Sequence, residues 1–151
     1  MRIALYQPDQ AGNVGTILRL GACLGIAVDV IEPCGFPLSD RGLKRAGMDY
    51  LETAALTRHA DWESFAGACR GRIVLFTTKG ATPLPATNFE PNDILLFGSE
   101  SRGAPDAVHD RADLRVRIPL VAQARSLNIA VAAGIGLAEA LRQTGGWPEH
   151  D

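Results

Sequence analysis

Residues 118–141, IPLVAQARSLNIAVAAGIGLAEAL, decide the fold that we expect for this chain. The pattern predicts the end of a strand, a short loop and then a long helix. Ser126 is well suited to begin that helix, because its hydroxyl can accept a hydrogen bond from one of the first free N–H groups. Up to Arg142 the helix is interrupted only by the polar residues Asn128 and Glu139. A helix that is apolar on every side is expected to be buried on every side.

Two glycines inside this helix, Gly134 and Gly136, need a physical reason. Each costs about 1 kcal/mol relative to alanine in a helix, so we expect that another helix approaches closely there. The entry to the helix is a second point of interest. Free N–H groups converge at the start of a buried helix and make it a natural place for a ligand.

The chain has 151 residues, of which 46% are hydrophobic and 21% are charged. This size and balance predict a single globular domain over residues 1–151. The formal net charge of −2 excludes a surface that is basic throughout, although it allows a local basic patch. No apolar run reaches the roughly 18 uninterrupted residues of a membrane span, so we expect no membrane partner.

Cysteine and histidine are few and scattered. They form no C-x-x-C pair and show no metal-ligand spacing: Cys23, Cys34, Cys69, His59, His109 and His150. We therefore expect neither a disulfide framework nor a bound metal. The N-terminal MRIALYQPDQ lacks the pattern of a signal peptide, and these features together favour a reduced, cytoplasmic setting.

Short apolar runs alternate with helical patterns along the chain. We predict strands at 2–6, 28–31, 51–57, 72–78, 94–98 and 114–119. We also predict a tight turn at Gly12–Gly15 and, after it, a helix that ends at Gly25, further helices at 40–47, 61–70 and 105–112, and a Pro-rich loop at 79–93. Because the strands are apolar along their whole length, both faces of the sheet should be covered, as in an α/β domain with a mainly parallel sheet.

Three loops with polar residues follow candidate strands. The first holds Asn13, Gly15 and Arg19, the second is Phe97–Gly103 and the third is Ile118–Asn128. Ligands of open α/β sheets bind at the carboxyl ends of the strands, where these loops would meet. Each loop taken alone also has an ordinary explanation, as a glycine turn, a surface arginine or a plain helix start.

The familiar nucleotide and hydrolase signatures are missing. The chain has no G-x-G-x-x-G after the first strand, no G-x-x-x-x-G-K-[ST] and no G-x-S-x-G. An ordinary dinucleotide dehydrogenase, a P-loop enzyme and an α/β-hydrolase are therefore not expected.

Seven motifs follow one another along nearly the whole chain. They are N-x-G-x-x-x-R (Asn13 to Arg19), IEP-x-GF (Ile31 to Phe36), RAG-x-DY (Arg45 to Tyr50), TRH (Thr57 to His59), TTKG (Thr77 to Gly80), FG-x-E-x-RG (Phe97 to Gly103) and IP…RSLN (Ile118 to Asn128). In this order they resemble the SPOUT superfamily of RNA methyltransferases. The chain is most similar to the small, single-domain TrmL type, which methylates the ribose 2′-hydroxyl of the wobble nucleotide of certain tRNAs.

The resemblance implies a fold, a cofactor and an assembly. The fold would be a Rossmann-like α/β domain whose C-terminal part, about residues 94–143, forms a deep trefoil knot, an exception to the rule against threaded chains. The methyl donor would be S-adenosylmethionine, and the working unit would be a homodimer with the donor site near the interface. Gly134 and Gly136 would then serve close helix packing between subunits.

The resemblance also assigns a donor site, residue by residue. The backbone around six residues would hold the adenosyl group: Phe76, Thr77, Gly98, Ile118, Ser126 and Leu127. Adenine needs a flat apolar slot with directional backbone groups, and loops rich in Leu, Ile and Gly supply both.

Four residues would act on the substrate hydroxyl: Arg19, Asn13, Glu100 and Asn128. Guanidinium keeps its proton in proteins. Arg19 therefore suits the stabilisation of a developing alkoxide, or a bidentate clamp on the adjacent phosphate, better than the role of a base. Glu100 could favour the sulfonium, orient Arg19 or stabilise its own loop, and Asn128 could bridge loops or face the substrate.

Five cationic residues are candidates for tRNA phosphate contacts, with a solvated surface as the alternative for each: Arg41, Lys44, Arg45, Arg102 and Arg125. A dimer would double any such patch and could overcome the slightly acidic total. Many TrmL-type relatives carry a tyrosine where this chain has Ala138, a difference that bears on the choice of RNA.

Three alternatives stay open at this point. One is a SPOUT enzyme that acts on another tRNA position or on ribosomal RNA, rather than on cytidine 34 or modified uridine 34 of tRNA. Another is a knotted protein that binds the donor without catalysis. The third is an unrelated nucleotide-binding α/β domain.

Overall fold

The computed structural model describes residues 1–45, 55–79 and 82–150, and in this part of the chain seven strands form one sheet. Their order is β3-β2-β1-β6-β4-β7-β5, and every paired strand is parallel to its neighbour. The predicted α/β domain with a mainly parallel sheet is confirmed. The strands are β1 (Arg2–Tyr6), β2 (Ala27–Ile31), β3 (Leu56–His59), β4 (Ile73–Phe76), β5 (Thr82–Pro83), β6 (Ile94–Phe97) and β7 (Leu114–Arg117).

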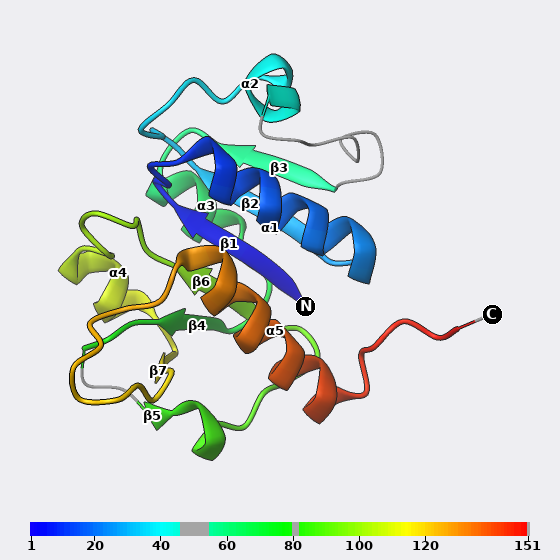
Figure 1. The fold of residues 1–151 in the computed structure, drawn as a ribbon, viewed down its shortest axis with the longest axis vertical. Coiled ribbons are helices and arrows are strands. Elements are labelled where there is room, and N and C mark those ends of the chain that lie inside the picture. The colour runs from blue at the N-terminus through cyan, green and yellow to red at the C-terminus, as the bar shows by residue number, and fades with distance from the viewer. Residues whose placement is uncertain (46–54, 80–81, 151) are drawn as a thin grey trace.

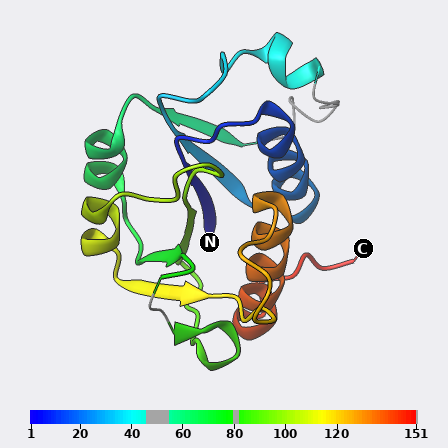
Figure 2. The same ribbon diagram turned by 60° about the vertical axis from the view of Figure 1, so that its left-hand side comes forward.

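Helices cover both faces of the sheet. Figure 2 shows α1 (Ala11–Leu24) and α5 (Ile129–Thr144) on one face, with α3 (Trp62–Ala68) and α4 (Asp106–Arg111) on the other. The short α2 (Asp40–Arg45) lies beyond the β3 edge (Figure 1). Each face has its own apolar core, and this explains why the central strands β4 and β6 are apolar along their whole length. The expectation does not hold for β3 and β7, which carry exposed polar side chains. Among the described residues, no helix combines the length and apolarity that crossing a membrane requires.

The helix of residues 118–141 differs from the prediction at its start. It begins at Ile129, and Asn128 caps it by accepting hydrogen bonds from the N–H groups of Ala130 at 2.8 Å and Val131 at 3.3 Å. Ser126 is exposed and lies in the loop before the helix. An Asn side chain caps as well as a Ser, so the choice between Ser126 and Asn128 depends on contacts that the local sequence does not reveal.

The expectation that α5 is buried on every side is wrong for the single chain. Val131 and Ile135 are 51% and 40% exposed, one turn apart on its outer side. The opposite side packs on the sheet through Ala133, Leu137 and Ala140, all fully buried. No element among the described residues covers the outer side, so a helix with apolar residues all round is left half exposed.

Three other sequence predictions need correction. Gly12–Gly15 is not a tight turn, because α1 begins at Ala11 and includes it; burial of Val14, Ile17 and Leu18 outweighs the low helix propensity of glycine. The strand expected at 51–57 is β3 at Leu56–His59, and 51–54 lie outside the described residues. The loop at 79–93 contains β5 and a 3₁₀ turn at Leu84–Ala86.

The motif from Arg45 to Tyr50 falls almost wholly outside the described residues, as does Gly80.

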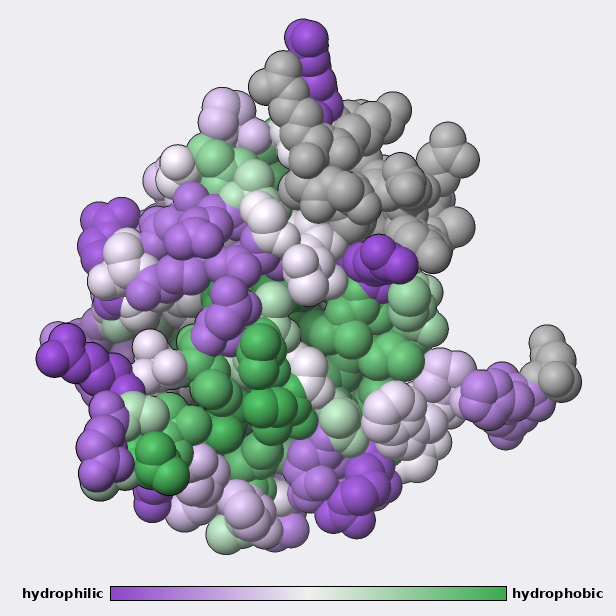
Figure 3. All heavy atoms as spheres, in the orientation of Figure 1, coloured by the Kyte–Doolittle hydropathy of each residue, from purple (hydrophilic) through white to green (hydrophobic). Residues whose placement is uncertain are grey.

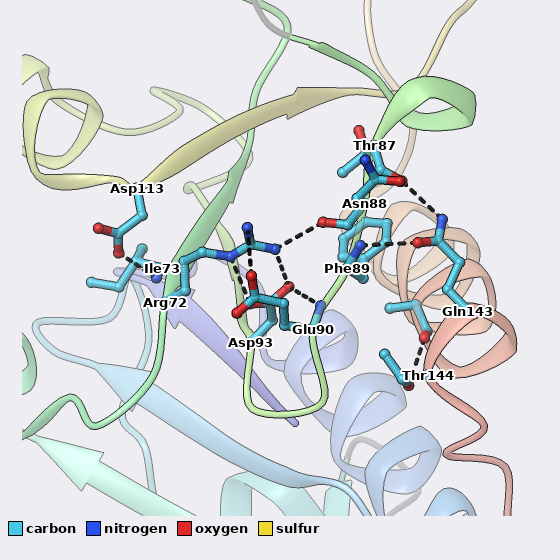
Figure 4. Close-up of polar contacts among 11 residues, drawn as sticks. Arg72, Ile73, Thr87, Asn88, Phe89, Glu90, Asp93, Asp113, Gln143 and Thr144 are labelled. Carbon is cyan, nitrogen blue, oxygen red and sulfur yellow. Dashed lines mark hydrogen bonds and ion pairs between the residues drawn. The ribbon is translucent and has the colours of Figure 1, made fainter.

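A polar cluster ties the far end of α5 to the sheet (Figure 4). Arg72 donates to both carboxylate oxygens of the fully buried Asp93, at 2.9 and 2.8 Å, and this hydrogen bonding raises the pKa of Arg72. Gln143 on α5 donates to the carbonyl of Thr87 at 2.9 Å and accepts from the N–H of Phe89 at 2.9 Å. The loop between β5 and β6 is therefore held to the start of β4 and to the end of α5, which fixes the position of Phe89.

We predict that Arg72→Ala lowers the free energy of unfolding by about 3 kcal/mol, because Asp93 stays buried without its cation. Arg70→Ala, which removes an exposed arginine two residues earlier, is the matched control and should change it by less than about 0.5 kcal/mol. Urea unfolding followed by circular dichroism measures both. Equal effects of the two substitutions would contradict a structural role for the Arg72–Asp93 pair.

Candidate functional site

A pocket of about 480 Å³ lies where β4, β6 and β7 end. The strand register places Phe76 beside both Phe97 and Val116, so the three loops that follow these residues leave the sheet at one level. All six residues expected to hold the donor line this pocket, together with three of the four expected to act on the substrate: Phe76, Thr77, Gly98, Ile118, Ser126, Leu127, Asn13, Glu100 and Asn128.

Aromatic rings form the apolar floor of the pocket. Phe76 stacks on Phe97 with ring centres 4.7 Å apart. The Phe76 ring is also nearly parallel to that of Phe89, with ring centres 6.3 Å apart. Phe76 and Phe97 both line the pocket. A flat, rigid apolar surface of this kind suits a planar base.

Gly98 starts the loop after β6, and no side chain fits there. A Cβ at this position would come within 2.5 Å of the carbonyl carbon of Gly103 and 2.7 Å of the amide nitrogen of Ala104. The loop closes on itself because Ser99 and Gly103 exchange two backbone hydrogen bonds of 3.0 and 2.8 Å. The backbone of the loop is thus brought against the pocket, where its polar groups can meet a ligand.

A chain of hydrogen bonds joins the three loops. Asn13 donates from Nδ2 to Glu100 Oε1 at 3.1 Å and accepts on Oδ1 from Asn128 Nδ2 at 3.1 Å. The other oxygen of Glu100 accepts from the backbone N–H of Asp9 at 2.8 Å. Asn128 is also the cap of α5, so the chain runs from the loop after β6 through α1 to the start of α5.

Asp9 secures the loop after β6 from the other side. Its carboxylate accepts from the hydroxyl of Ser101 at 2.6 Å and from the Ser101 N–H at 2.9 Å, and these bonds lower the pKa of Asp9. The backbone N–H of Asp9 in turn donates to the Glu100 carboxylate. The segment after β1 and the loop after β6 are therefore joined both through the Asp9 carboxylate and through the Glu100 carboxylate.

Comparison with known proteins agrees with this geometry. Residues 1–138 match the SpoU rRNA Methylase family. The chain belongs to the SpoU methylase family. A relative from Beijerinckia indica, named tRNA (cytidine(34)-2′-O)-methyltransferase, is 54% identical over 146 residues, which covers 95% of this chain and 91% of the relative.

Two solved structures extend the SpoU comparison. One, described as "Structural insights into the 2-OH methylation of C/U34 on tRNA", has a TM-score of 0.89 at 40% identity and covers 94% of both chains. The other is the SpoU methyltransferase AviRb from Streptomyces viridochromogenes in complex with the cofactor AdoMet. Its TM-score is 0.83 at 26% identity, over 95% of this chain and 60% of that one.

Arg19 is the substrate residue that this SpoU chain does not bring to the pocket. It is exposed on α1, six residues after Asn13, which places the two side chains about 120° apart around the helix. Arg19 is absent from the lining of the pocket, which includes Asn13. Within one chain, therefore, Asn13 faces the pocket and Arg19 faces elsewhere.

The five expected RNA-binding cations are dispersed. Arg102 lines the main pocket, and Arg41 lines a second, shallower one beside the start of α1, together with Phe36 and Pro37. Arg125 is exposed in the loop before α5 and lines neither pocket. The side chains of Lys44 and Arg45 lie outside what the structure describes.

Sequence reasoning gave no role to several residues that line the SpoU pocket, among them Gln10, Lys79, Leu120 and His109. His109 is the most informative of them, because it is buried and polar. The signal that could have found it is its place in the short helix Asp106–Arg111, which follows the Phe97–Gly103 loop. Among the described residues, no group of three or more His, Cys, Asp or Glu side chains is placed to hold a metal.

Gly136 lies against the floor of the pocket and not against another helix. A Cβ there would come within 2.6 Å of the Phe76 ring, which is held between two other aromatic rings. At Gly134, apart from the backbone of its own helix, no atom of the described residues lies within 4 Å of such a Cβ. The described part of the chain therefore gives a reason for the small size of Gly136 and none for that of Gly134.

We predict that Gly136→Ala lowers the free energy of unfolding by about 1–2 kcal/mol. Overpacking against Phe76 costs about 1–3 kcal/mol, and the better helix propensity of alanine returns up to about 1 kcal/mol. The control Gly67→Ala, at an exposed position of α3 with open space around its Cβ, should raise it by up to about 1 kcal/mol. Urea unfolding distinguishes them, and stabilisation by both substitutions would disprove the close contact.

Proposed function

We propose that this chain is a tRNA methyltransferase that transfers the methyl group of S-adenosylmethionine to the ribose 2′-hydroxyl of the wobble nucleotide, cytidine 34 or a modified uridine 34. One observation carries the proposal: the three polar loops of a SpoU methylase meet around one pocket and are joined by the Glu100–Asn13–Asn128 chain. Relatives and a solved structure that match nearly the full length support the choice of nucleotide.

The residues present fit S-adenosylmethionine. The pocket volume of about 480 Å³ lies in the ordinary range for small-molecule sites, and its floor is flat and apolar. Phe76, Thr77 and Gly98 on one side, with Ile118, Ser126 and Leu127 on the other, would hold the adenosyl group. The bound donor would supply a methyl group that its sulfonium already activates, so the protein has mainly to align the reactants.

The polar chain would orient the substrate hydroxyl. Asn13 and Asn128 are fixed by each other and by Glu100, so their amide groups present donors and acceptors in one arrangement. Each carboxylate oxygen of Glu100 accepts a hydrogen bond, one from the Asp9 N–H and one from Asn13 Nδ2, so Glu100 is a positioning residue in this site. A pre-set arrangement of this kind lowers the cost of aligning a hydroxyl for transfer.

A homodimer is part of the proposal. The apolar outer side of α5, with Val131 and Ile135, is exposed beside the pocket, and the space-filling view shows a hydrophobic area around the position of α5 (Figure 3). A second copy that covers this side would remove apolar surface from water. It could also bring its own Arg19 to this pocket, where it would stabilise the developing alkoxide or clamp the adjacent phosphate.

The proposal extends to the knot and to the RNA surface. The C-terminal part, about residues 94–143, would form a trefoil knot, with the pocket-lining segment 118–126 between β7 and α5 as its threaded loop. Arg102 at the pocket and Arg41 at the shallow pocket beside α1 would contact tRNA phosphates, with Arg125, Lys44 and Arg45 further out. The compartment of such an enzyme would be the cytoplasm.

The deciding experiment is incubation with donor labelled in its methyl group and with total tRNA, followed by mapping of the modified nucleotide. We predict 2′-O-methylation at nucleotide 34 by the wild-type chain. Leu127→Trp, which fills the pocket, is the control and should abolish it. Label at another tRNA position would refute the choice of nucleotide, and donor binding without transfer would refute catalysis.

The two-subunit site has its own test. Arg19→Ala and Leu127→Trp should each abolish methylation when present in both subunits. If Arg19 serves the pocket of the partner, co-expression of the two variants should restore about a quarter of wild-type activity, because half of the dimers are mixed and each mixed dimer has one intact site. Mixed preparations that remain inactive would show that Arg19 acts within its own chain. Light scattering of the same samples gives the oligomeric state.

A further inference from the structure

His109 is a buried histidine in the wall of the pocket, with a hydrogen bond at each ring nitrogen. It is 8% exposed and lines the pocket from α4. Its Nδ1 lies 3.2 Å from the carbonyl oxygen of Pro105, and its Nε2 lies 3.0 Å from the hydroxyl oxygen of Thr77. Thr77 also lines the pocket and is one of the residues proposed to hold the donor.

The partners of His109 determine where its protons lie. A carbonyl oxygen only accepts, so Nδ1 must carry the hydrogen in its bond to Pro105. In the neutral ring Nε2 is then an acceptor, and the Thr77 hydroxyl donates its single proton to it. The same hydroxyl oxygen accepts the N–H of Lys79 at 3.2 Å. What Thr77 has left to offer a ligand is a lone pair.

We propose that His109 is a positioning residue that fixes Thr77 as a hydrogen-bond acceptor toward the donor molecule, and that donor affinity therefore depends on the charge of His109. This inference rests on the proposed function, since it concerns the same site. The ligand group that it selects is a hydrogen-bond donor, which in an adenosyl compound is the exocyclic amino group or a ribose hydroxyl.

Protonation of His109 reverses this arrangement. Both ring nitrogens then donate, and Thr77 must accept from His109 as well as from Lys79. The hydroxyl proton turns away from the ring. Thr77 then points a hydrogen-bond donor at a ligand group that is itself a hydrogen-bond donor. A buried polar group that loses its partner costs about 1–3 kcal/mol. The affinity for the donor molecule is therefore highest while the imidazole is neutral, and it decreases as the pH falls and the imidazole is protonated.

Charged groups on the surrounding elements also contribute to the electrostatic potential at His109. They are Asp106, Asp110 and Arg111 on α4, Lys79 after β4, Glu100 and Arg102 after β6, and Asp113, Arg115 and Arg117 around β7. A charged imidazole would also repel the sulfonium of S-adenosylmethionine. The product S-adenosylhomocysteine has no sulfonium, so it is the probe that isolates the hydrogen bond.

The experiment is calorimetric titration of the full-length protein with S-adenosylhomocysteine at pH 7.5 and pH 5.5. Loss of a buried hydrogen-bond partner costs about 1–3 kcal/mol, so wild-type affinity should fall about tenfold from the higher to the lower pH. His109→Gln keeps an acceptor for Thr77 but cannot be charged, and its affinity should stay near the wild-type value of pH 7.5 at both pH values. Ionisation of the ligand itself affects all variants alike.

Two further variants keep the test decisive. His150→Gln makes the same substitution in the exposed C-terminal tail and should retain the wild-type tenfold change. Thr77→Val removes the hydroxyl and should bind more weakly than wild type at pH 7.5, with no remaining dependence on pH. Equal pH dependence in wild type and His109→Gln, or a wild-type pH profile in Thr77→Val, would overturn the inference. Absence of binding at pH 7.5 by the wild-type chain would instead refute the donor site itself.

S-inosylhomocysteine, which carries a carbonyl in place of the amino group, identifies the group that Thr77 contacts. If Thr77 binds the amino group, this probe should bind better at pH 5.5 than at pH 7.5, because only then does Thr77 donate. If Thr77 binds a ribose hydroxyl, the probe should show the same tenfold loss at pH 5.5 as S-adenosylhomocysteine. Both results support the role of His109, and affinity that is the same at both pH values contradicts it.

Discussion

One amide group, that of Asn13, holds the two halves of the pocket together. Its nitrogen donates to Glu100 in the loop after β6, and its oxygen accepts from Asn128 at the start of α5. Asn128 in turn spends its own oxygen on the first N–H groups of α5. Since a carboxylate only accepts and a helix start only donates, each amide between them can satisfy its neighbours in a single orientation.

The position of α5 is then fixed at three points along its length. Asn128 sets its first residue, Gly136 lets its middle rest on the Phe76 ring, and Gln143 binds the backbone at Thr87 and Phe89 near its end. Phe76 is itself part of the pocket floor. A shift of α5 at any of these points would therefore change the shape of the pocket, which explains why a half-exposed helix governs the site.

Much of this could be predicted from the chain alone, because the deciding signals were local. Apolar runs such as 94–98 predicted the buried strands, and parallel strands bring the loops after them together, so the loops at 97–103 and 118–128 were expected in one place. The choice of the donor residues from Phe76 to Leu127 came from the resemblance to a known family. The start of α5 could not be predicted. Ser126 and Asn128 are both good caps. Asn128 is the residue that caps the helix, and its side chain is also held by Asn13, 115 positions earlier. Likewise, the periodicity of α5 could not show that the chain leaves Val131 uncovered, and nothing local marks His109 as a partner of Thr77, 32 positions away.

The two hydrogen-bond chains of the pocket follow the same logic but differ in one respect. Each ends on a group that can only accept: the Glu100 carboxylate in one, and the Pro105 carbonyl in the other. The direction of every other bond is set from that end. Between Glu100 and α5 the intermediate groups are amides, whose donor and acceptor ends exchange only if the side chain turns over. Between Pro105 and the ligand the intermediate groups are the His109 imidazole, which can take up a proton without moving, and the Thr77 hydroxyl. The substrate side of the pocket is therefore fixed by geometry, whereas the side that Thr77 faces depends on a proton as well.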